Sequence, residues 1–126
     1  MVGLLVVSHS ADAARGIRDI AAEMGGADAD IVPVGGDPDG GIGTSVPAIQ
    51  AALEGMASDE VVVLVDLGSA VMNAEMAIET TEKEVVVADA PVLEGTLNAA
   101  VEAASSAATL DSVRESAEDA RDVSKV

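Results

Sequence analysis

The sequence contains no cysteine and no Phe, Tyr or Trp. Without cysteine, disulfides, zinc–thiolate sites and a cysteine nucleophile are excluded, and without aromatic rings there is no platform for stacking bases, flavins or sugars. The core must therefore be built from Val, Leu, Ile, Ala and Met. No apolar run approaches the roughly 20 residues that a membrane span needs, and no basic segment precedes an apolar one at the N-terminus. We expect a soluble, cytoplasmic protein with no membrane contact.

Basic residues are also scarce, since 6 Lys and Arg stand against 23 Asp and Glu, for a net charge of −17. This charge repels nucleic acid and anionic membranes, so neither is expected as a partner. The acidic residues are dispersed along the chain, and a hydrophobic content of 49% argues against disorder. A dispersed acidic surface resembles proteins from organisms that keep molar salt in the cytoplasm, where the Debye length is only about 3 Å. We therefore expect an acidic, halophile-type surface.

Four apolar runs alternate with amphipathic segments along the 126 residues. The runs predict strands at about 4–7, 31–34, 60–66 and 84–89, and three- to four-residue apolar spacing predicts helices at about 11–24, 46–56, 70–81, 93–107 and 110–126. This alternation is typical of an α/β fold with a small, mainly parallel β-sheet and helices on both faces. We expect one domain over residues 1–126, with the last helix covering the sheet or mediating an oligomer contact.

The only histidine, His9, follows the first strand, and Asp66 ends the third. The carboxyl ends of parallel strands are where ligands collect, so the two side chains can converge. Asp66 would then accept the Nδ1 proton of His9 and leave Nε2 as a nucleophile for a phosphoryl group, near the helix N-terminus opened by Gly68 and Ser69. The alternatives are that His9 only makes local hydrogen bonds and that Asp66 only caps the helix.

Other chemistries lack the residues they require. One histidine without cysteine cannot build a typical zinc site, and the carboxylates lack calcium-loop spacing, so no metal site is expected. No glycine-rich phosphate-binding motif is present, which makes nucleotide binding by this chain unexpected, and the glycine-rich segment 35–45 is by default a flexible connection. An aspartyl-phosphate receiver needs acidic ligands after its first strand, where Ser8 and His9 stand. A serine hydrolase is disfavoured because no Gly-x-Ser-x-Gly elbow occurs.

Four motifs occur in order along nearly the whole chain: Val6-Val7-Ser8-His9-Ser10, Ile42-Gly43-Thr44-Ser45, Asp66-Leu67-Gly68-Ser69-Ala70 with Asn73 and Glu75, and Ala90-Pro91-Val92-Leu93-Glu94-Gly95. Together they resemble the phosphoryl-transfer subunit of phosphoenolpyruvate-dependent dihydroxyacetone kinase, which is similar in turn to the mannose-type IIA domains of the sugar phosphotransferase system. Val92 and Leu93 stand in the reverse of the expected order, but both are apolar.

The resemblance implies that the histidine-containing phosphocarrier protein phosphorylates His9, and that the phosphoryl group passes to ADP on a nucleotide-binding kinase subunit. A further, dihydroxyacetone-binding subunit completes that system. Asp66 would orient the imidazole, and the phosphate site would be lined by Gly43, Thr44, Gly68, Ser69 and Asn73. The resemblance implies a homodimer and no cofactor on this chain, because ADP and Mg belong to the partner subunit. Larger relatives append carrier domains, so we expect the donor here to be a separate protein.

Two other functions stay open at this point. A mannose-type IIA component of a sugar transporter would share the fold and His9 but have another acceptor, and a non-catalytic binding module would leave His9 inert. Whether Arg15 or Arg18 reaches the site is also open. Because molar salt screens charge-guided docking, we expect a partner to dock mainly through apolar contacts around His9.

Overall fold

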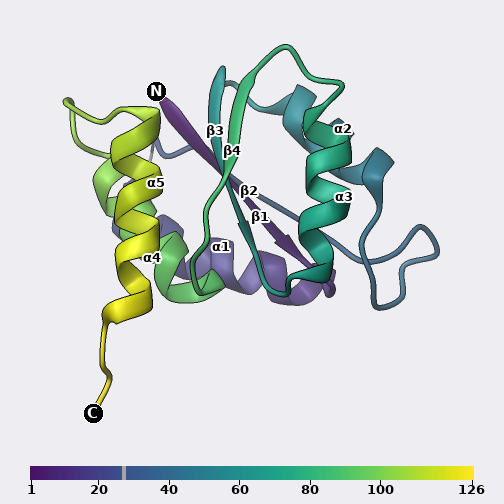
Figure 1. The fold of residues 1–126 in the computed structure, drawn as a ribbon, viewed down its shortest axis with the longest axis horizontal. Coiled ribbons are helices and arrows are strands. Elements are labelled where there is room, and N and C mark those ends of the chain that lie inside the picture. Colours follow the sequence, from purple (N-terminus) through teal and green to yellow (C-terminus); the bar gives the residue numbers. More distant parts are fainter. Residues whose placement is uncertain (27) are drawn as a thin grey trace.

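The structure is a computed structural model that describes residues 1–26 and 28–126 (Figure 1). Four strands alternate with helices, as the apolar pattern predicts. The elements are β1 (Val2–Ser8), α1 (Ala11–Gly25), β2 (Ile31–Gly35), α2 (Val46–Gly55), β3 (Glu60–Val65), α3 (Ser69–Ile78), β4 (Glu84–Val87), α4 (Val92–Ala103), α5 (Leu110–Asp119) and the short 3₁₀ helix η1 (Ala120–Asp122). No helix within the described residues is both long and apolar enough to cross a membrane.

The four strands form one parallel sheet in the order β2-β1-β3-β4. β1 is central and all seven of its residues are buried. In the register, Val7 of β1 lies opposite Val34 of β2 and Val65 of β3. The residues that follow Val7 and Val65 therefore leave the same edge of the sheet side by side, which is the geometry expected for His9 and Asp66.

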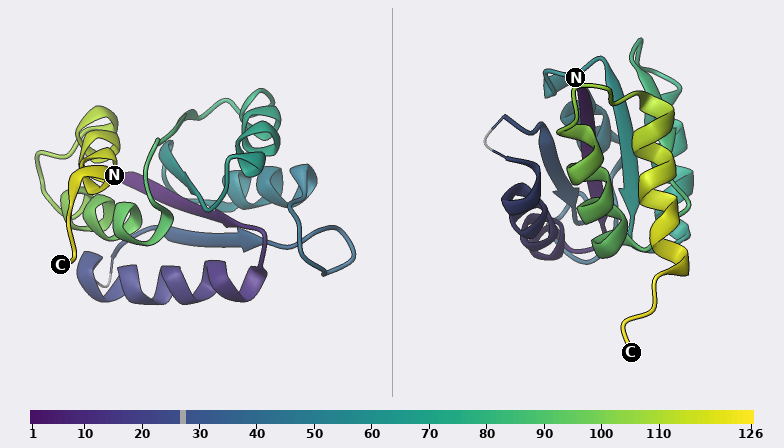
Figure 2. Two further views of the ribbon diagram at one scale, coloured as in Figure 1. Left: turned by 60° about the horizontal axis from the view of Figure 1, so that its bottom comes forward. Right: turned by 90° about the vertical axis from the view of Figure 1, so that its left-hand side faces the viewer.

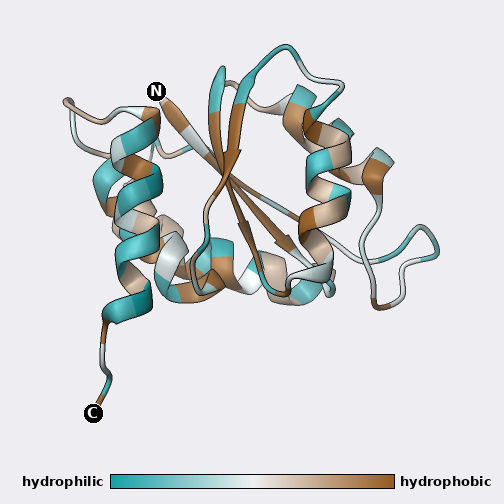
Figure 3. Cartoon of the chain, in the orientation of Figure 1, coloured by the Kyte–Doolittle hydropathy of each residue, from teal (hydrophilic) through white to brown (hydrophobic). Residues whose placement is uncertain are grey.

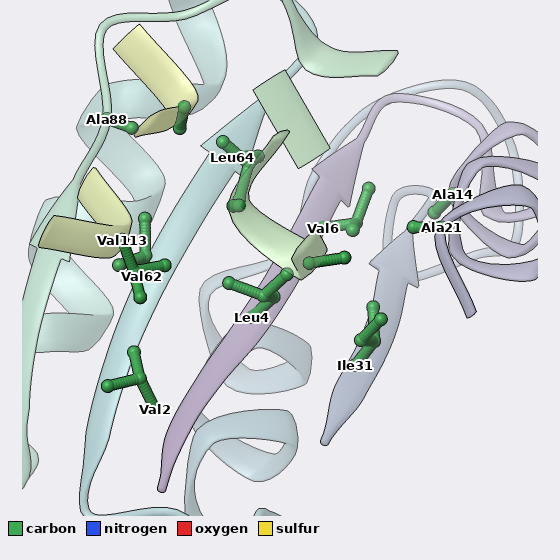
Figure 4. Close-up of a cluster of buried hydrophobic side chains, with 13 residues drawn as sticks. Val2, Leu4, Val6, Ala14, Ala21, Ile31, Val62, Leu64, Ala88 and Val113 are labelled. Carbon is green, nitrogen blue, oxygen red and sulfur yellow. The ribbon is translucent and has the colours of Figure 1, made fainter. Parts of the chain in front are cut away.

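Alternate residues of the central strands build two cores, one on each face of the sheet. On one face Leu4 and Leu64 belong to a cluster with side chains of α1, α4 and α5 (Figure 4). On the other face Leu5 and Val63 pack against α2 and α3. Figures 1 and 2 show the helices in these two groups, and Figure 3 shows the strands as mainly apolar and the helices around them as a mixture of polar and apolar residues. The predicted fold class, a parallel sheet covered on both faces, is confirmed.

Three predicted helices end earlier than their apolar pattern suggests, and α3 is the first of them, because it ends at Ile78 and not near Thr81. α4 stops at Ala103, not near 107, because the chain turns so that Thr109 can cap α5. α5 stops at Asp119, and the chain beyond η1 is extended, not helical to residue 126. The buried stripe of this segment ends at Ala120, and Val123 is 61% exposed, so no packing holds a further turn.

Candidate functional site

His9 and Asp66 lie in hydrogen-bond contact at the carboxyl edge of the sheet. His9 Nδ1 is 2.9 Å from Asp66 Oδ1, and each side chain is 21% exposed. Since a carboxylate can only accept, Nδ1 carries the proton in this pair, and Nε2 of the neutral ring keeps its lone pair. The pair leaves Nε2 as the nucleophilic atom.

Asp66 accepts further hydrogen bonds that fix its orientation. Its Oδ2 accepts from the Ser8 hydroxyl at 2.9 Å and from the His9 backbone N–H at 3.0 Å. Burial acts to raise the pKa of Asp66, but the hydrogen bonds from His9 and Ser8 outweigh it and hold the pKa below its ordinary value. Asp66 is therefore ionised at neutral pH. The N-cap of α3 is Gly68, with no side-chain capping bond, so the alternative that Asp66 only caps this helix is not what the structure shows.

Ser69 contacts the other nitrogen of the imidazole. It is the first residue of α3, and its Oγ lies 2.9 Å from His9 Nε2. With the proton on Nδ1, the Ser69 hydroxyl donates to Nε2. Gly68, immediately before it, has helical backbone angles and open space where a Cβ would stand.

The segment between β2 and α2 is held by hydrogen bonds, contrary to the expectation of a flexible connection. Asp37 Oδ1 accepts from the backbone N–H groups of Asp39 at 2.9 Å and Gly41 at 2.7 Å. The Gly43 N–H donates to the His9 carbonyl at 2.9 Å, with Gly43 at a φ of 150°. The glycine-rich segment is thus fixed beside the histidine.

The remaining candidates, Thr44, Asn73 and the two arginines, form hydrogen bonds or ion pairs with residues other than His9 and Asp66. Asn73 Nδ2 donates to Thr44 Oγ1 at 2.6 Å, and so links α3 to the residue before the N-cap of α2. Arg15 and Arg18 pair with Asp12 and Asp19 on their own helix. Within residues 1–26 and 28–126, no hydrogen bond or ion pair joins either arginine, Thr44 or Asn73 to His9 or Asp66.

Sequence reasoning missed two residues that organise the site, Ser8 and Asp37. Ser8 is only 2% exposed, yet a serine at the end of an apolar strand gives no signal that its hydroxyl bonds a residue 58 positions away. Asp37 stands in an Asp-Pro-Asp-Gly segment, and that composition is a turn signal that could have predicted the ordered segment. No cluster of three or more His, Cys, Asp or Glu side chains suited to a metal ion occurs among the described residues.

Exposed apolar side chains adjoin the site residues along the chain. Ile42 precedes Gly43 and is 78% exposed, Leu67 follows Asp66 and is 57% exposed, and Met72 precedes Asn73 and is 71% exposed. We call these three residues the apolar rim. Each of the three is a direct sequence neighbour of a candidate site residue, and exposed apolar side chains that gather at a polar site are typical of an interaction surface.

Residues 3–114 match the family described as "PTS system fructose IIA component". The chain is 44% identical over 93 residues to the protein named "PEP-dependent dihydroxyacetone kinase 1, phosphoryl donor subunit DhaM" of Listeria innocua, covering 74% of each chain. It is 34% identical over 118 residues to "PTS-dependent dihydroxyacetone kinase, phosphotransferase subunit DhaM" of Lactococcus lactis, covering 92% of this chain and 93% of that protein. A DhaM protein of Escherichia coli is 37% identical over 115 residues, but the match spans only 24% of its length.

Solved structures share the fold. A crystal structure of a protein of unknown function superposes with a TM-score of 0.78 at 29% identity, covering 94% of this chain and 93% of that one. The phosphotransferase-system component EIIA of Streptococcus agalactiae superposes with a TM-score of 0.67 at 21% identity, covering 98% and 97%. The second likeness concerns the fold alone.

Proposed function

Because the chain belongs to the family described as "PTS system fructose IIA component", we propose that it is the phosphoryl donor subunit of a dihydroxyacetone kinase that draws on phosphoenolpyruvate. Relatives named as such subunits cover most of the chain. The observation that carries the proposal is the His9–Asp66 pair, which keeps the proton on Nδ1 and leaves the lone pair on Nε2 as the nucleophile. On this proposal residues 1–126 act as one phosphoryl-carrier domain.

Neutral His9 is the acceptor in the transfer step. Its Nε2 attacks the phosphorus carried by the histidine-containing phosphocarrier protein, so that one N–P bond forms as the donor's N–P bond breaks. Asp66 holds the Nδ1 proton and stabilises the positive charge that develops on the ring. Before the attack the Ser69 hydroxyl leaves Nε2, which frees the lone pair, and it then donates to a phosphoryl oxygen.

The rest of the phosphate site is supplied by neutral groups. Gly43, Thr44, Gly68 and Asn73 line it with Ser69, and no arginine clamps the phosphoryl group. A phosphoramidate held by neutral donors stays labile, which suits onward transfer to ADP, held with Mg on the nucleotide-binding subunit. That transfer forms an O–P bond to ADP as the Nε2–P bond breaks.

The apolar rim, formed by Ile42, Leu67 and Met72, is where the phosphocarrier protein and the kinase subunits dock in turn. A chain of net charge −17 in concentrated salt gains little from charge steering, so docking rests on these side chains. The functional unit is a homodimer whose two sites stay open to these partners.

A second candidate is the IIA component of a sugar transporter. A solved structure titled "Mannose/sorbose specific IIA subunit of phosphotransferase system", from Enterococcus faecalis, superposes over 98% of this chain with a TM-score of 0.55 at 26% identity. Both candidates use His9 and differ in the acceptor.

The deciding experiment measures the intact mass of the chain in high-KCl buffer. The chain is incubated with phosphoenolpyruvate and the two general phosphotransferase proteins, and the kinase subunit with ADP is then added. We expect a gain of one acid-labile phosphoryl group, absent in a folded His9→Ala variant, and its loss on adding the ADP complex. Uptake without discharge favours the sugar-transport candidate. No uptake by folded protein overturns both and leaves a binding module.

A further inference from the structure

Ser69, His9 and Asp66 form a continuous hydrogen-bonded chain of hydroxyl, imidazole and carboxylate. Ser69 Oγ lies 2.9 Å from His9 Nε2, and His9 Nδ1 lies 2.9 Å from Asp66 Oδ1. This is the arrangement of nucleophile, general base and orienting acid in serine hydrolases, which is defined by geometry and not by sequence order. The sequence disfavours a hydrolase only because it lacks one motif of one hydrolase class. That motif is not needed to bring these three groups together.

We propose that Ser69 of the unphosphorylated protein is an activated nucleophile that accepts acyl groups from small, neutral carboxylic esters. His9 acts as its general base, and Asp66 holds the required tautomer. The proposal uses the same His9–Asp66 pair as phosphoryl transfer but does not depend on it, because no phosphoryl donor takes part.

The step balances as acyl transfer followed by hydrolysis. Ser69 Oγ adds to the ester carbonyl carbon while its proton passes to His9 Nε2. The tetrahedral adduct expels the alcohol, which takes that proton, and acyl-Ser69 remains. Water then attacks the acyl group with the same help from His9, and releases the carboxylic acid and free Ser69.

The surroundings favour a neutral ester over an anionic one. A groove of about 380 Å³ lies between α3 and the end of β4 and is lined by Asp66 and Gly68, which bound the triad's side of α3, whereas Ser69 and His9 stand outside its lining. Val71 and Val87 give it apolar walls, while Glu75 and Asp89 also line it and repel anions. Ser69 itself lies at the start of α3, where its N–H has no carbonyl of the same helix to bond, and it can donate to the oxyanion.

The test uses p-nitrophenyl acetate, with release of p-nitrophenol followed by absorbance and the acetyl group located by peptide mass mapping. We expect the acetyl group on Ser69, and a rate about 100-fold lower in Ser69→Ala and in His9→Ala, as for loss of a nucleophile or a general base. Asp66→Asn lowers the rate as well. Phosphorylating His9 beforehand protects Ser69 from acetylation. Ser106→Ala, an exposed serine away from the site, leaves the rate unchanged.

An acetyl group found only on His9, or a rate unaffected by Ser69→Ala in protein shown to be folded, overturns the proposal. The outcome is separable from the proposed function, because phosphoryl uptake by the wild-type chain is measured in a different assay. Uptake with no acetylation of Ser69 rejects this inference alone. Acetylation of Ser69 with no uptake rejects the phosphoryl relay alone.

Discussion

Ser8 connects three parts of the site through one buried hydroxyl. Its Oγ donates to Asp66 Oδ2 at 2.9 Å and accepts from the Ser10 N–H at 3.1 Å, so the end of β1, the end of β3 and the start of α1 share it. With Oδ2 held in this way, Oδ1 faces His9 Nδ1. Ser8 is thus a positioning residue that acts on His9 through Asp66.

Ser8→Ala is expected to lower the free energy of unfolding by about 2 kcal/mol, the usual range for a buried hydrogen bond to a charged group. It should also reduce the fraction of His9 protonated at Nδ1, as seen in the ¹⁵N shifts of the ring, and slow phosphoryl uptake about tenfold. The matched control is Ser10→Ala, which removes the N-cap of α1 and costs about 1 kcal/mol. The control should leave the tautomer unchanged. A Ser8→Ala variant with the wild-type tautomer and rate contradicts the positioning role.

The ionised state of Asp66 predicts a pH-dependent contribution to stability. Its pKa is lowered in the folded chain, so the unfolded chain binds more protons as the pH falls. The stabilisation is therefore complete above the unfolded pKa, about 3.9, and is lost as the pH falls through the lower folded value. The difference in unfolding free energy between wild type and Asp66→Asn should be largest near pH 7 and shrink below about pH 4.

Urea unfolding at constant KCl measures this difference at pH 7 and pH 3. Asp39→Asn is the control, because that side chain accepts no hydrogen bond from a described residue and is exposed. Its effect should be small at both pH values. A difference for Asp66→Asn that stays constant over this range contradicts the argument.

Gly35 is where β2 must pass closest to the site. It pairs with Ser8 across the sheet, and a Cβ built on it would lie 2.6 Å from the Ser8 carbonyl oxygen and 2.8 Å from that of Ser10. Both are backbone atoms at the base of His9, which cannot shift without moving the histidine. Gly35→Ala is expected to cost about 3 kcal/mol in unfolding free energy by overpacking.

Gly16→Ala is the matched control, measured by the same urea titration. Gly16 lies inside α1 with open space where a Cβ would stand, so alanine should stabilise by about 0.5–1 kcal/mol through helix propensity. Equal changes in unfolding free energy for Gly35→Ala and Gly16→Ala would mean that the close backbone contacts do not exclude a side chain at Gly35.

The strands were predictable because runs such as Val61–Val65 are typical of strands covered on both faces in a parallel sheet, and parallel strands end at one edge. The meeting of His9 and Asp66 follows from that topology. The contact between Ser69 and Nε2 does not, because it depends on where packing of Ala70, Ala74 and Ala77 sets the first turn of α3. The helix ends at Ala103 and Asp119 were missed because apolar spacing continues in the sequence where the packing partner stops.

The apolar rim predicts how a partner is recognised. Met72 lies on α3 near the site with 71% of its surface exposed, and it makes no part of either core. Met72→Lys should weaken binding of the phosphocarrier protein about tenfold in 2 M KCl, as measured by titration calorimetry, because an apolar contact is lost where charge is screened. Val101→Lys, at an exposed position of α4, is the control and should bind like wild type. If the affinity of the wild-type chain for the phosphocarrier protein falls steeply as the salt concentration rises, docking does not rest on apolar contacts.

Each of the six cationic side chains has a partner. Arg15, Arg18, Arg114, Arg121 and Lys125 pair with carboxylates, and Lys83 donates to the carbonyls of Met56 at 2.8 Å and Ser58 at 2.6 Å. Most of the 23 acidic side chains are left to repel one another. Glu60 and Glu84 stand directly opposite in the sheet register.

Glu84→Gln is therefore expected to stabilise the chain by about 0.5 kcal/mol in 0.1 M KCl, where the Debye length is about 10 Å, and to have no effect above about 1 M, where it is about 3 Å. Glu118→Gln should do the opposite at low salt, because Glu118 pairs with Arg114 at 2.7 Å and accepts from the Asp89 N–H. Thermal melts of both variants and the wild type across this range of KCl test the pair together. If Glu84→Gln still stabilises the chain at high salt, the stabilisation does not come from relieved repulsion between carboxylates. Screening of such repulsion would then not explain the acidic surface.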